Sequence, residues 1–551
     1  MNVELIEHLK EFLVKNDING MIVNSTNEFL VEYNSLGQNS RYHLTGFTGS
    51  TGDVLFTADK IYLFVDTRYH EQAENEVDKD YVELVKMPLT QSFLNALTEK
   101  VPAYFKLGIV SKKVSKKFYD SLSKNLQSKN SSIKLLNYDP VIEFMKDSIK
   151  EVSYNVFDVN TGITGQSSDE KFEVIKDIAG DKFNILVSSL EDIAYLTNKR
   201  SYSFDYSSVF PAKAIINENG VTIYTDCDVP YVGGKYRISS LKDFEIDLKN
   251  IQNAEIFIDD TQLSIYDFKL INSNNKILQS HLKLFKTIKN ESEINHLKYC
   301  FERADNALKV VFEMINSDTI YSEYDYYEAL VKAMKDNGAA SLSFKPIVAA
   351  GSNTSIIHYS TPSKEKLVED GDLLLVDFGG YYEGGLATDT TRTFIKGTPT
   401  EEQKIAYTTV LKAFLNAYCN KYTKKSSYFN IDKIARETIE KTAPEGFAFS
   451  HSTGHGVGIS VHENPPRVSS SDASKTKIQE NTVFSIEPGL YKEGVFGIRL
   501  ENTVYAAYEE ENIVMHSLSR FPFEVKLVDF SMMQDFEKYY YIKWQASACI
   551  Q

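Results

Sequence analysis

The stretch DLLLVDFGGYYEGGLATDTTRTF, residues 372–394, decides how the C-terminal half of the chain folds. An apolar run at 373–376 ends in Asp377, and four glycines in the following eight residues supply turn conformations. A second strand-like run then places Asp389 and two threonines on one face, since side chains alternate along a strand. The pattern predicts a β-hairpin that brings Asp377 and Asp389 face to face.

Two carboxylates held this close repel each other unless a cation lies between them or one of them takes a proton. A metal ion resolves the conflict, so we interpret the hairpin as part of a metal site. Asp beside Gly is also common in tight turns, where its side chain bonds to the backbone. That role would suffice for Asp377 or Asp389 alone, but not for both of them after so apolar a strand.

Two further acids occur in strand-like segments nearer the C-terminus. Glu487 ends the apolar run of NTVFSIEPGLY, and Glu501 is expected inside the strand-like VFGIRLENTVY. An acid in a buried strand is costly when unpaired, so Glu501 requires a cation or a strong hydrogen-bond donor. Arg499 lies on the same face two residues earlier and is the alternative donor.

Three of the ten histidines lie in HSTGHGVGISVHENPP, residues 451–466. His455 stands between two glycines, which allow close approach of the backbone to a ligand, and Val457 with Ile459 is expected to begin a strand. A lone histidine here would more often be a core residue, but four carboxylates accompany this one. Two Asp, two Glu and one His suit a pair of divalent ions such as Mn²⁺, Co²⁺, Fe²⁺ or Zn²⁺, about 3.5–4 Å apart. The set predicts metal-assisted hydrolysis.

The composition excludes several classes of function. The 551 residues are 42% hydrophobic and 25% charged, as in ordinary globular proteins, and the formal net charge is -16 without a basic run, so we expect no nucleic-acid partner. The first twenty residues are charged and amphipathic, and no stretch approaches about 18 apolar residues, so we expect a cytoplasmic protein with no membrane partner. Four distant cysteines without a CxxC pair argue against a zinc knuckle or a disulfide framework.

Two stretches in the first half share a pattern. GMIVNSTNEFLVEYNS (20–35) and NILVSSLEDIAYLTNK (184–199) each pass from an apolar strand-like run, through a polar turn, into a helix-like start. Further strand signals at 53–66 and 255–260 alternate with helical stretches. The first half therefore predicts two related α/β domains.

The character of the sequence changes in the second half. Two pairs of helical segments, 289–335 and 400–442, alternate with strand-like segments, which predicts a larger α+β domain. We place the boundaries where periodicity is lost near 150–168 and before the long amphipathic helix that starts at 289. The expected domains are residues 1–163, 164–284 and 285–551.

The metal motifs resemble those of the pita-bread metallopeptidases, family M24, which include methionine aminopeptidase, prolidase and aminopeptidase P. The motifs are DFGG…TDTTRTF, STGHGVG, SIEPGLY and GIRLEN, carrying in order Asp377, Asp389, His455, Glu487 and Glu501. Similarity to the three-domain cytosolic branch of aminopeptidase P extends through YHLTGFTGSTGDVLF, FVDTRYHEQA, LVSSLEDIAYLTNKR, KNESEI and SLSFKPIVAAGSNTSIIHYS. The resemblance implies two creatinase-like α/β domains followed by a pita-bread α+β catalytic domain.

The resemblance also implies roles for the five donors. Asp377 would bind one ion through both oxygens, Asp389 and Glu501 would bridge two ions, and His455 with Glu487 would hold the other. Glu487 would also accept a proton from the nucleophilic water.

Four more residues are expected to contact the substrate or to line its binding site. His358 and His462 match the two substrate-facing histidines of the family, which orient the peptide and stabilise the oxyanion. His451 matches a further active-site histidine that lines the cleft. We expect Arg499 to bind the substrate together with these histidines.

The activity implied is that of an Xaa-Pro aminopeptidase: release of the N-terminal residue from peptides with proline second, by a hydroxide that bridges two divalent ions. Mn²⁺ is the expected ion, and a homodimer is the expected assembly. Xaa-Pro bonds resist ordinary peptidases, because the proline nitrogen has no hydrogen to donate and its ring fixes the backbone.

Two alternatives use the same fold. A prolidase would cleave only Xaa-Pro dipeptides, and usually has two domains, whereas this chain has an additional α/β domain. A non-catalytic scaffold would predict losses among the metal ligands, yet all five are present, and creatinase-like hydrolases lack this ligand set.

Two features depart from the family pattern. The interval from Asp377 to Asp389 is one residue longer than usual, although a longer hairpin loop can absorb a residue without moving either Asp. In the second domain, NKRSYSFDYSSVF lacks the Gly and Pro expected there, which leaves the shape of that loop open.

Overall fold

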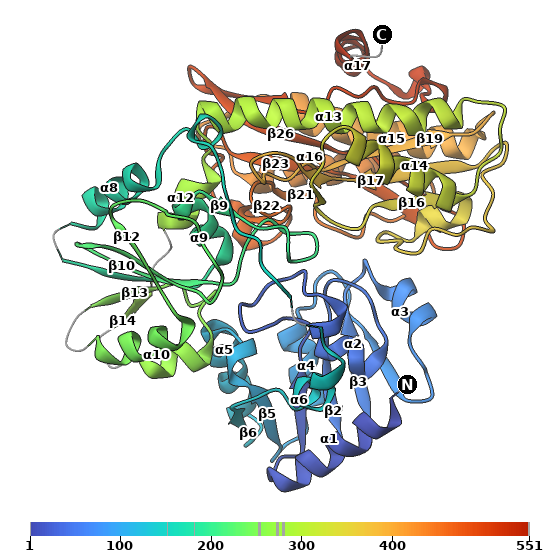
Figure 1. Cartoon of the computed structure of the whole chain (residues 1–551). Coiled ribbons are helices and arrows are strands. Elements are labelled where there is room, and N and C mark those ends of the chain that lie inside the picture. The colour runs from blue at the N-terminus through green and yellow to red at the C-terminus, as the bar shows by residue number, and fades with distance from the viewer. Residues whose placement is uncertain are drawn as a thin grey trace. The chain divides into compact units, whose positions relative to one another are not determined.

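The computed structural model describes residues 2–150, 152–180, 182–251, 255–271, 275–277 and 281–548. The chain divides into two compact units, which Figure 1 shows as parts of one chain. The first unit comprises residues 1–158, 166–205 and 209–282, and the second comprises 159–165, 206–208 and 283–551. Cys227, Cys300 and Cys419 carry free thiols, and Cys549 lies outside the described residues.

The first unit contains two six-stranded sheets of the same topology. The first has the order β4-β3-β2-β1-β5-β6 and the second β12-β11-β10-β8-β13-β14. The strands of the first sheet are β1 (Gly20–Val23), β2 (Asp53–Thr57), β3 (Ile61–Val65), β4 (Val82–Lys86), β5 (Lys106–Val110) and β6 (Ser132–Leu136). Those of the second are β8 (Asn184–Val187), β10 (Lys213–Asn217), β11 (Gly220–Tyr224), β12 (Tyr236–Ser239), β13 (Ile256–Ile258) and β14 (Asn275–Ile277).

The pairing directions of the two sheets also match. The central strand, β1 or β8, is antiparallel to one neighbour and parallel to the other, and the outermost pair on each side is parallel. Helices cover the sheets: α1 (Val3–Lys15), α2 (Ser40–Thr45), α3 (His70–Glu76), α4 (Phe93–Lys100), α5 (Lys116–Gln127) and α6 (Pro140–Met145) with the first, and α8 (Ser168–Ala179), α9 (Leu190–Thr197), α10 (Leu241–Asn250) and α11 (Ile265–Leu270) with the second. The expectation of two related α/β folds is confirmed.

The predicted repeat was wrong in one detail, the helix expected after the first strand-like run. A helix follows the second strand-like run, where Ser189 caps α9, but residues 24–35 form turns. In that segment the Asn27 side chain accepts a hydrogen bond from the Phe29 backbone at 2.9 Å, and Leu30 has φ 58°. A local side-chain bond and a left-handed residue replace the first helical turn.

Backbone hydrogen bonds connect the two α/β folds within the first unit, from α5 to the turn that precedes α11. The Lys116 N–H donates to the Leu263 carbonyl at 2.8 Å, and the Lys117 N–H donates to the Asp260 carbonyl at 2.9 Å. The division of the first half at 163/164 and 284/285 therefore stays a prediction.

The second unit is built on two pairs of long helices and several sheets. The helices are α13 (Glu291–Ile315), α14 (Glu323–Asp336), α15 (Glu401–Cys419) and α16 (Tyr428–Thr442), with α7 (Thr161–Thr164) and α17 (Asp535–Ser547) in addition; α12 spans His281–Thr287. A three-stranded sheet has the order β16-β17-β19, and a six-stranded sheet the order β20-β27-β26-β23-β21-β22. This confirms the predicted helix pairs and the α+β class.

The strands of the second unit are β16 (Ile347–Ala350), β17 (Leu373–Phe378), β19 (Thr390–Ile395), β20 (Tyr422–Thr423), β21 (Gly454–Gly456), β22 (Glu463–Val468), β23 (Val483–Ile486), β26 (Asn502–Glu509) and β27 (Asn512–Ser517). Two short pairs are β15 (Ser341–Leu342) with β18 (Gly380–Tyr381), and β24 (Gly489–Lys492) with β25 (Phe496–Arg499). In the first unit, β7 (Phe157–Asp158) pairs with β9 (Lys199–Arg200).

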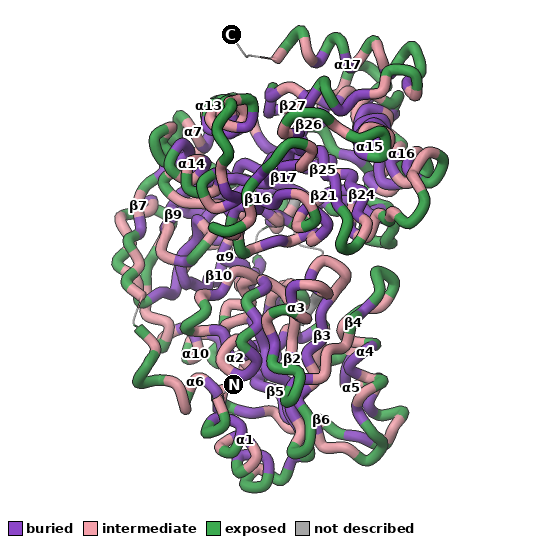
Figure 2. Tube along the Cα trace, turned by 90° about the vertical axis from the view of Figure 1, so that its right-hand side faces the viewer, coloured by how far each residue is buried: buried purple, intermediate pink, exposed green. Residues whose placement is uncertain are grey.

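The predicted hairpin is confirmed, and it lies in the core. All residues of β17 and β19 are buried, as Figure 2 shows for β17. Leu374 and Val376 pack among residues of α13 and α14, whereas Leu373 and Leu375 pack into two other clusters. A strand buried on both faces needs apolar residues at consecutive positions, which explains the unbroken run.

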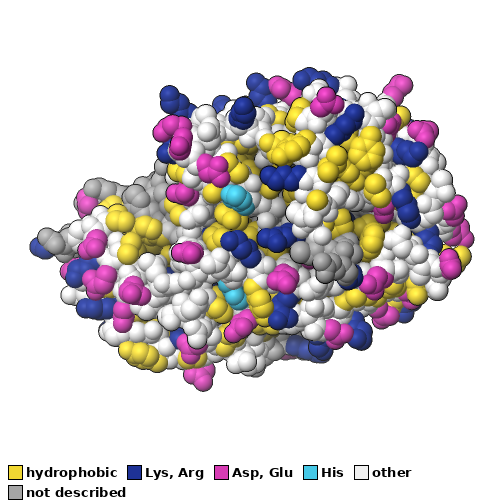
Figure 3. Space-filling view, turned by 90° about the horizontal axis from the view of Figure 1, so that it is seen from above, with side chains coloured by type: hydrophobic (Ala, Val, Ile, Leu, Met, Phe, Trp, Pro, Cys, Tyr) yellow, Lys and Arg dark blue, Asp and Glu magenta, His cyan; other side chains and the backbone are white. Residues whose placement is uncertain are grey.

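The surface is mixed in charge. On the face shown in Figure 3, acidic and basic side chains are interspersed with apolar groups. Among the helices that the structure describes, none combines the length and the apolar character that a membrane crossing requires.

We expect Leu374→Ala to lower the free energy of unfolding of the second unit by about 2–5 kcal/mol, because it opens a cavity beneath α13 and α14. Urea unfolding followed by the fluorescence of Trp544, the single tryptophan, which lies in this unit, measures the change. Leu367→Ala is the matched control, since Leu367 is 45% exposed, and should shift stability by about 0.5 kcal/mol or less. Equal losses in the two variants would contradict the packing described.

Candidate metal centre

The hairpin places its two acids on one face. Asp377 lies in β17 opposite Thr391 of β19, and Asp389 directly precedes β19. Residues two apart share a face, so Asp377, Thr391 and Asp389 point to the same side. The register from Leu373 to Phe378 is continuous, and so the longer glycine-rich loop leaves the strand pairing intact.

Glu487 and Glu501 lie where neighbouring strands end. β23 stops just before Glu487, and Ile486 pairs with Asn502 of β26, so the next position brings Glu487 beside Glu501. Glu501 lies between β25 and β26, so the expectation of a position inside a strand was wrong. The chain changes from one sheet to another at this break.

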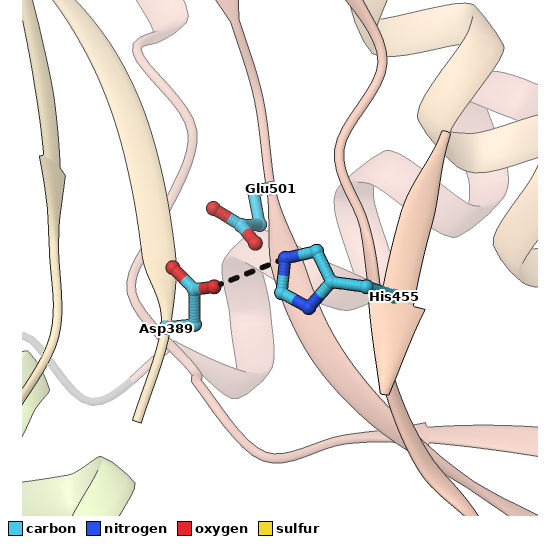
Figure 4. Close-up of side chains that lie close together, drawn as sticks. All are labelled: Asp389, His455 and Glu501. Atoms are coloured by element: carbon cyan, nitrogen blue, oxygen red, sulfur yellow. Dashed lines mark ion pairs between the residues drawn. The ribbon is translucent and has the colours of Figure 1, made fainter. Parts of the chain in front are cut away.

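His455 is the middle residue of β21, so the strand expected to begin at Val457 instead ends at Gly456. Its Nε2 lies 3.5 Å from Asp389 Oδ2, the pair joined by the dashed line in Figure 4. The same atom lies 3.9 Å from Glu487 Oε1. Its Nδ1 lies 3.0 Å from the Gly456 carbonyl, an acceptor that favours the tautomer with the proton on Nδ1, in which Nε2 can serve as a metal ligand.

The flanking glycines are required by close backbone contacts. A Cβ atom at Gly454 would lie 2.0 Å from the Ser485 carbonyl oxygen, and one at Gly456 would lie 2.3 Å from the Glu463 carbonyl oxygen. Side chains at either position would push β21 away from its neighbours and move His455.

Asp389, His455 and Glu501 converge. Each offers one ligand atom, and these atoms lie within 4.8 Å of one another. Figure 4 shows the three side chains pointing toward one another. Asp377 Oδ1 and Glu501 Oε1 are buried and accept no hydrogen bond from any described residue. Burial, followed by the charges of neighbouring carboxylates, raises the pKa of Asp389 and of Glu501 well above their usual values. Buried acceptors without donors and an imidazole aimed at them fit a divalent cation.

Arg499 does not pair with Glu501, so that alternative was wrong. Its Nη2 donates to Asp377 Oδ2 at 2.7 Å, whereas Glu501 Oε2 accepts from Thr391 Oγ1 at 2.7 Å. The rule that residues two apart share a face does not apply across the break between β25 and β26. Arg499 is 2% exposed, and its Nη1 also donates to Tyr491 OH at 2.8 Å.

The other three histidines are held in different ways. The His462 ring packs edge-on against His455, with 4.5 Å between ring centroids. His451 is buried, and its Nε2 lies 3.0 Å from Tyr491 OH. His358 is half-buried in the turn that follows the short helix η4 (Gly351–Ser355).

Sequence reasoning missed Tyr491 as a support of this centre. It placed Thr391 on the same face as Asp389, from their two-residue spacing, but gave it no role. Tyr491 gave no such signal, because its contacts with His451 and Arg499 depend on the pairing of β24 with β25.

We expect Asp389→Asn to stabilise the protein once a chelator has removed bound metal. The pKa of Asp389 is raised in the folded state, so the folded chain binds more protons than the unfolded chain and loses stability as pH rises through the folded pKa. The urea midpoint, followed by Trp544 fluorescence, should therefore be higher for the variant at pH 7.5, and the difference should shrink as pH falls toward about 4, the unfolded pKa.

With Mn²⁺ at saturation the urea midpoint of Asp389→Asn should instead be lower than that of the wild type. The wild type then gains stability from an ion that the variant holds poorly. If, in the metal-free protein, the difference in urea midpoint between the variant and the wild type stayed constant from pH 7.5 to 4, this account of the buried acids would be contradicted.

Related proteins cover nearly the whole chain. A protein of Laccaria bicolor named probable Xaa-Pro aminopeptidase P is 28% identical, over 98% of this chain and 88% of its own. Xaa-Pro aminopeptidase 1 of Dictyostelium discoideum is 29% identical, over 96% of this chain and 89% of its own. An X-prolyl aminopeptidase of Caenorhabditis elegans, described as a cytosolic enzyme with a di-nuclear active site, has the same fold: TM-score 0.92, 20% identity, 100% of this chain and 95% of that one.

Family models account for the chain in three consecutive pieces. Residues 6–145 and 147–293 each match the creatinase/prolidase N-terminal domain, and residues 295–507 match metallopeptidase family M24. The last range contains all five donor residues. The resemblance found in the motifs is thus confirmed: residues 295–507 form a domain of metallopeptidase family M24, and two creatinase/prolidase N-terminal domains precede it.

Proposed function

We propose that this protein is an Xaa-Pro aminopeptidase, which releases the N-terminal residue from peptides with proline in the second position. The observation that carries the proposal is the convergence of Asp389, His455 and Glu501, with Asp377 and Glu487 beside them, in a chain of this family. The full-length relatives named Xaa-Pro aminopeptidase support the choice of substrate.

Two divalent ions would be held by the five donors. Asp377, Asp389, His455, Glu487 and Glu501 supply mostly hard oxygen ligands with one imidazole, and we propose Mn²⁺ as the ion. When bound, such ions lower the pKa of water and polarise the carbonyl of the scissile bond.

The chain's own residues would then move protons and orient the peptide. Glu487 takes the proton of the attacking water and delivers it to the proline nitrogen, which leaves as a secondary amine. His358 and His462 orient the peptide and donate hydrogen bonds to the oxyanion, and His451 lines the cleft with its Nε2 against Tyr491 OH.

The contacts of Arg499 favour a second role beside the predicted one. Its guanidinium is buried and donates to Asp377, Tyr491 and the Ile357 carbonyl, the last at 3.2 Å. These contacts favour a role in holding Asp377 in place, and direct binding of substrate by Arg499 stays a prediction.

Three further proposals accompany this function. We propose a cytoplasmic location, since the relative from Caenorhabditis elegans is described as cytosolic, and a homodimer, which light scattering on the purified protein tests. We also keep the division into domains 1–163, 164–284 and 285–551. A prolidase or a non-catalytic scaffold on this fold is the alternative to the proposed function.

Product analysis distinguishes these alternatives. Protein freed of metal and then given Mn²⁺ should release Arg from Arg-Pro-Pro-Gly-Phe, detected by mass spectrometry, and metal-free protein should not. Ala-Pro serves as the parallel substrate. Cleavage of Ala-Pro alone would identify a prolidase, and cleavage of neither peptide would support the scaffold.

His462 and His455 differ in what their loss should remove. We expect His462→Ala to lower kcat by about 10²–10³, as the loss of an oxyanion donor does, with metal content unchanged. His455→Ala should lower metal content itself, because its Nε2 faces Asp389 and Glu487. Metal content measured by plasma mass spectrometry separates the two, and metal loss in His462→Ala would show that the roles are exchanged.

A further inference from the structure

Glu323 is a fully buried acid that the proposed chemistry does not use. It is the first residue of α14, and its four hydrogen-bond partners are all neutral groups. A buried charge without a counter-ion is costly unless strong hydrogen bonds replace the lost water. A carboxylate kept in such a place therefore indicates that its hydrogen bonds matter.

All four donors belong to the segment 350–363. One oxygen accepts from the Ala350 N–H at 2.6 Å and from Asn353 Nδ2 at 2.9 Å. The other accepts from Tyr359 OH at 2.7 Å and from the Ser363 N–H at 2.9 Å. One side chain thus ties both ends and the middle of this segment to α14.

The same segment is tied to the metal centre from its other side. The Ile357 carbonyl accepts from Arg499 Nη1 at 3.2 Å, and Nη2 of the same guanidinium binds Asp377. His358 follows Ile357 directly, so its backbone is held between Glu323 and the guanidinium that holds a predicted metal ligand.

We infer that Glu323 is a positioning residue, which fixes the segment 350–363 so that His358 is held in place for peptide hydrolysis. This inference rests on the proposed function, in which His358 orients the peptide. Glu323 itself touches neither substrate nor metal in this role. Its effect on turnover passes through His358 alone.

Glu323→Gln tests the inference with little change in volume. A carboxamide has one oxygen and one NH₂ group, and on each side of Glu323 stands a backbone N–H, from Ala350 or from Ser363. The NH₂ group must face one of these donors, so at least one end of the segment is released in either orientation.

Hydrogen exchange measured by mass spectrometry detects this release without any substrate. We expect peptides within 350–363 to exchange faster in Glu323→Gln, with peptides from 451–463 unchanged. Glu537→Gln is the matched control: Glu537 is 1% exposed, lies in the first turn of a different helix, α17, and accepts from Asn416 Nδ2 at 3.0 Å. It should leave exchange in 350–363 and turnover unchanged.

Kinetics test the dependence on His358. Glu323→Gln should lower kcat for Arg-Pro-Pro-Gly-Phe by about 10- to 100-fold, with metal content retained. In the His358→Ala background the same substitution should cause no further loss, because residues that act through one contact are not additive. A full second loss of kcat in the double variant, or unchanged exchange in 350–363, would overturn the inference.

Failure of the proposed function and failure of this inference give different experimental results. If the wild type cleaves no Xaa-Pro peptide, that function fails, while exchange still decides whether Glu323 holds the segment. Faster exchange confined to 350–363 would then support the positioning of His358, and exchange that rises throughout the second unit would refute it.

Discussion

Repulsion among four neighbouring carboxylates, three of them buried and Glu487 half-buried, is the constraint around which the second unit is organised. Asp377, Asp389, Glu487 and Glu501 lie at or beside strand ends, while the strand interiors between them are apolar and buried. Since a slip of one residue would turn every side chain of a strand to its other face, the apolar packing of β17 and β23 fixes where the acids point. The acids are therefore held together by the hydrophobic core, against their own electrostatics.

Acidic side chains hold the chain segments that carry the histidines around this centre. Two of these acids lie on helices, and a third is ion-paired. Glu323 of α14 holds the segment with His358, and Asp432 of α16 accepts from Thr453 Oγ1 at 2.7 Å, next to His451. Glu463 accepts from the Ile459 N–H at 3.1 Å and pairs with buried Lys289. Each of these histidine segments is thus held by an acid that is not one of the five metal donors.

The sequence allowed the hairpin, the helix pairs, the two α/β folds and the convergence of Asp389, His455 and Glu501 to be predicted, because each depends on local periodicity or on motifs. It did not allow the partner of Arg499 to be predicted, since alternation fails where the chain changes sheets between β25 and β26. Turns at 24–35 replaced a helix because Asn27 bonds to a nearby N–H. The hydrogen bonds of Glu323 could not be predicted from local sequence patterns, because its partners lie 27 to 40 residues away.

The order of the strands along the chain has a consequence for biosynthesis. The β17–β19 hairpin leaves the ribosome before Glu501 is made, and about 120 residues separate Asp377 from Glu501, roughly 6–25 s of translation at about 5–20 residues/s. Until residue 455 is added the nascent chain carries the two hairpin acids alone, and until Glu501 is added it lacks one of the five donors, so the complete cation site cannot yet exist. Binding of metal by all five donors is therefore possible only after Glu501 has been made and has folded beside the hairpin.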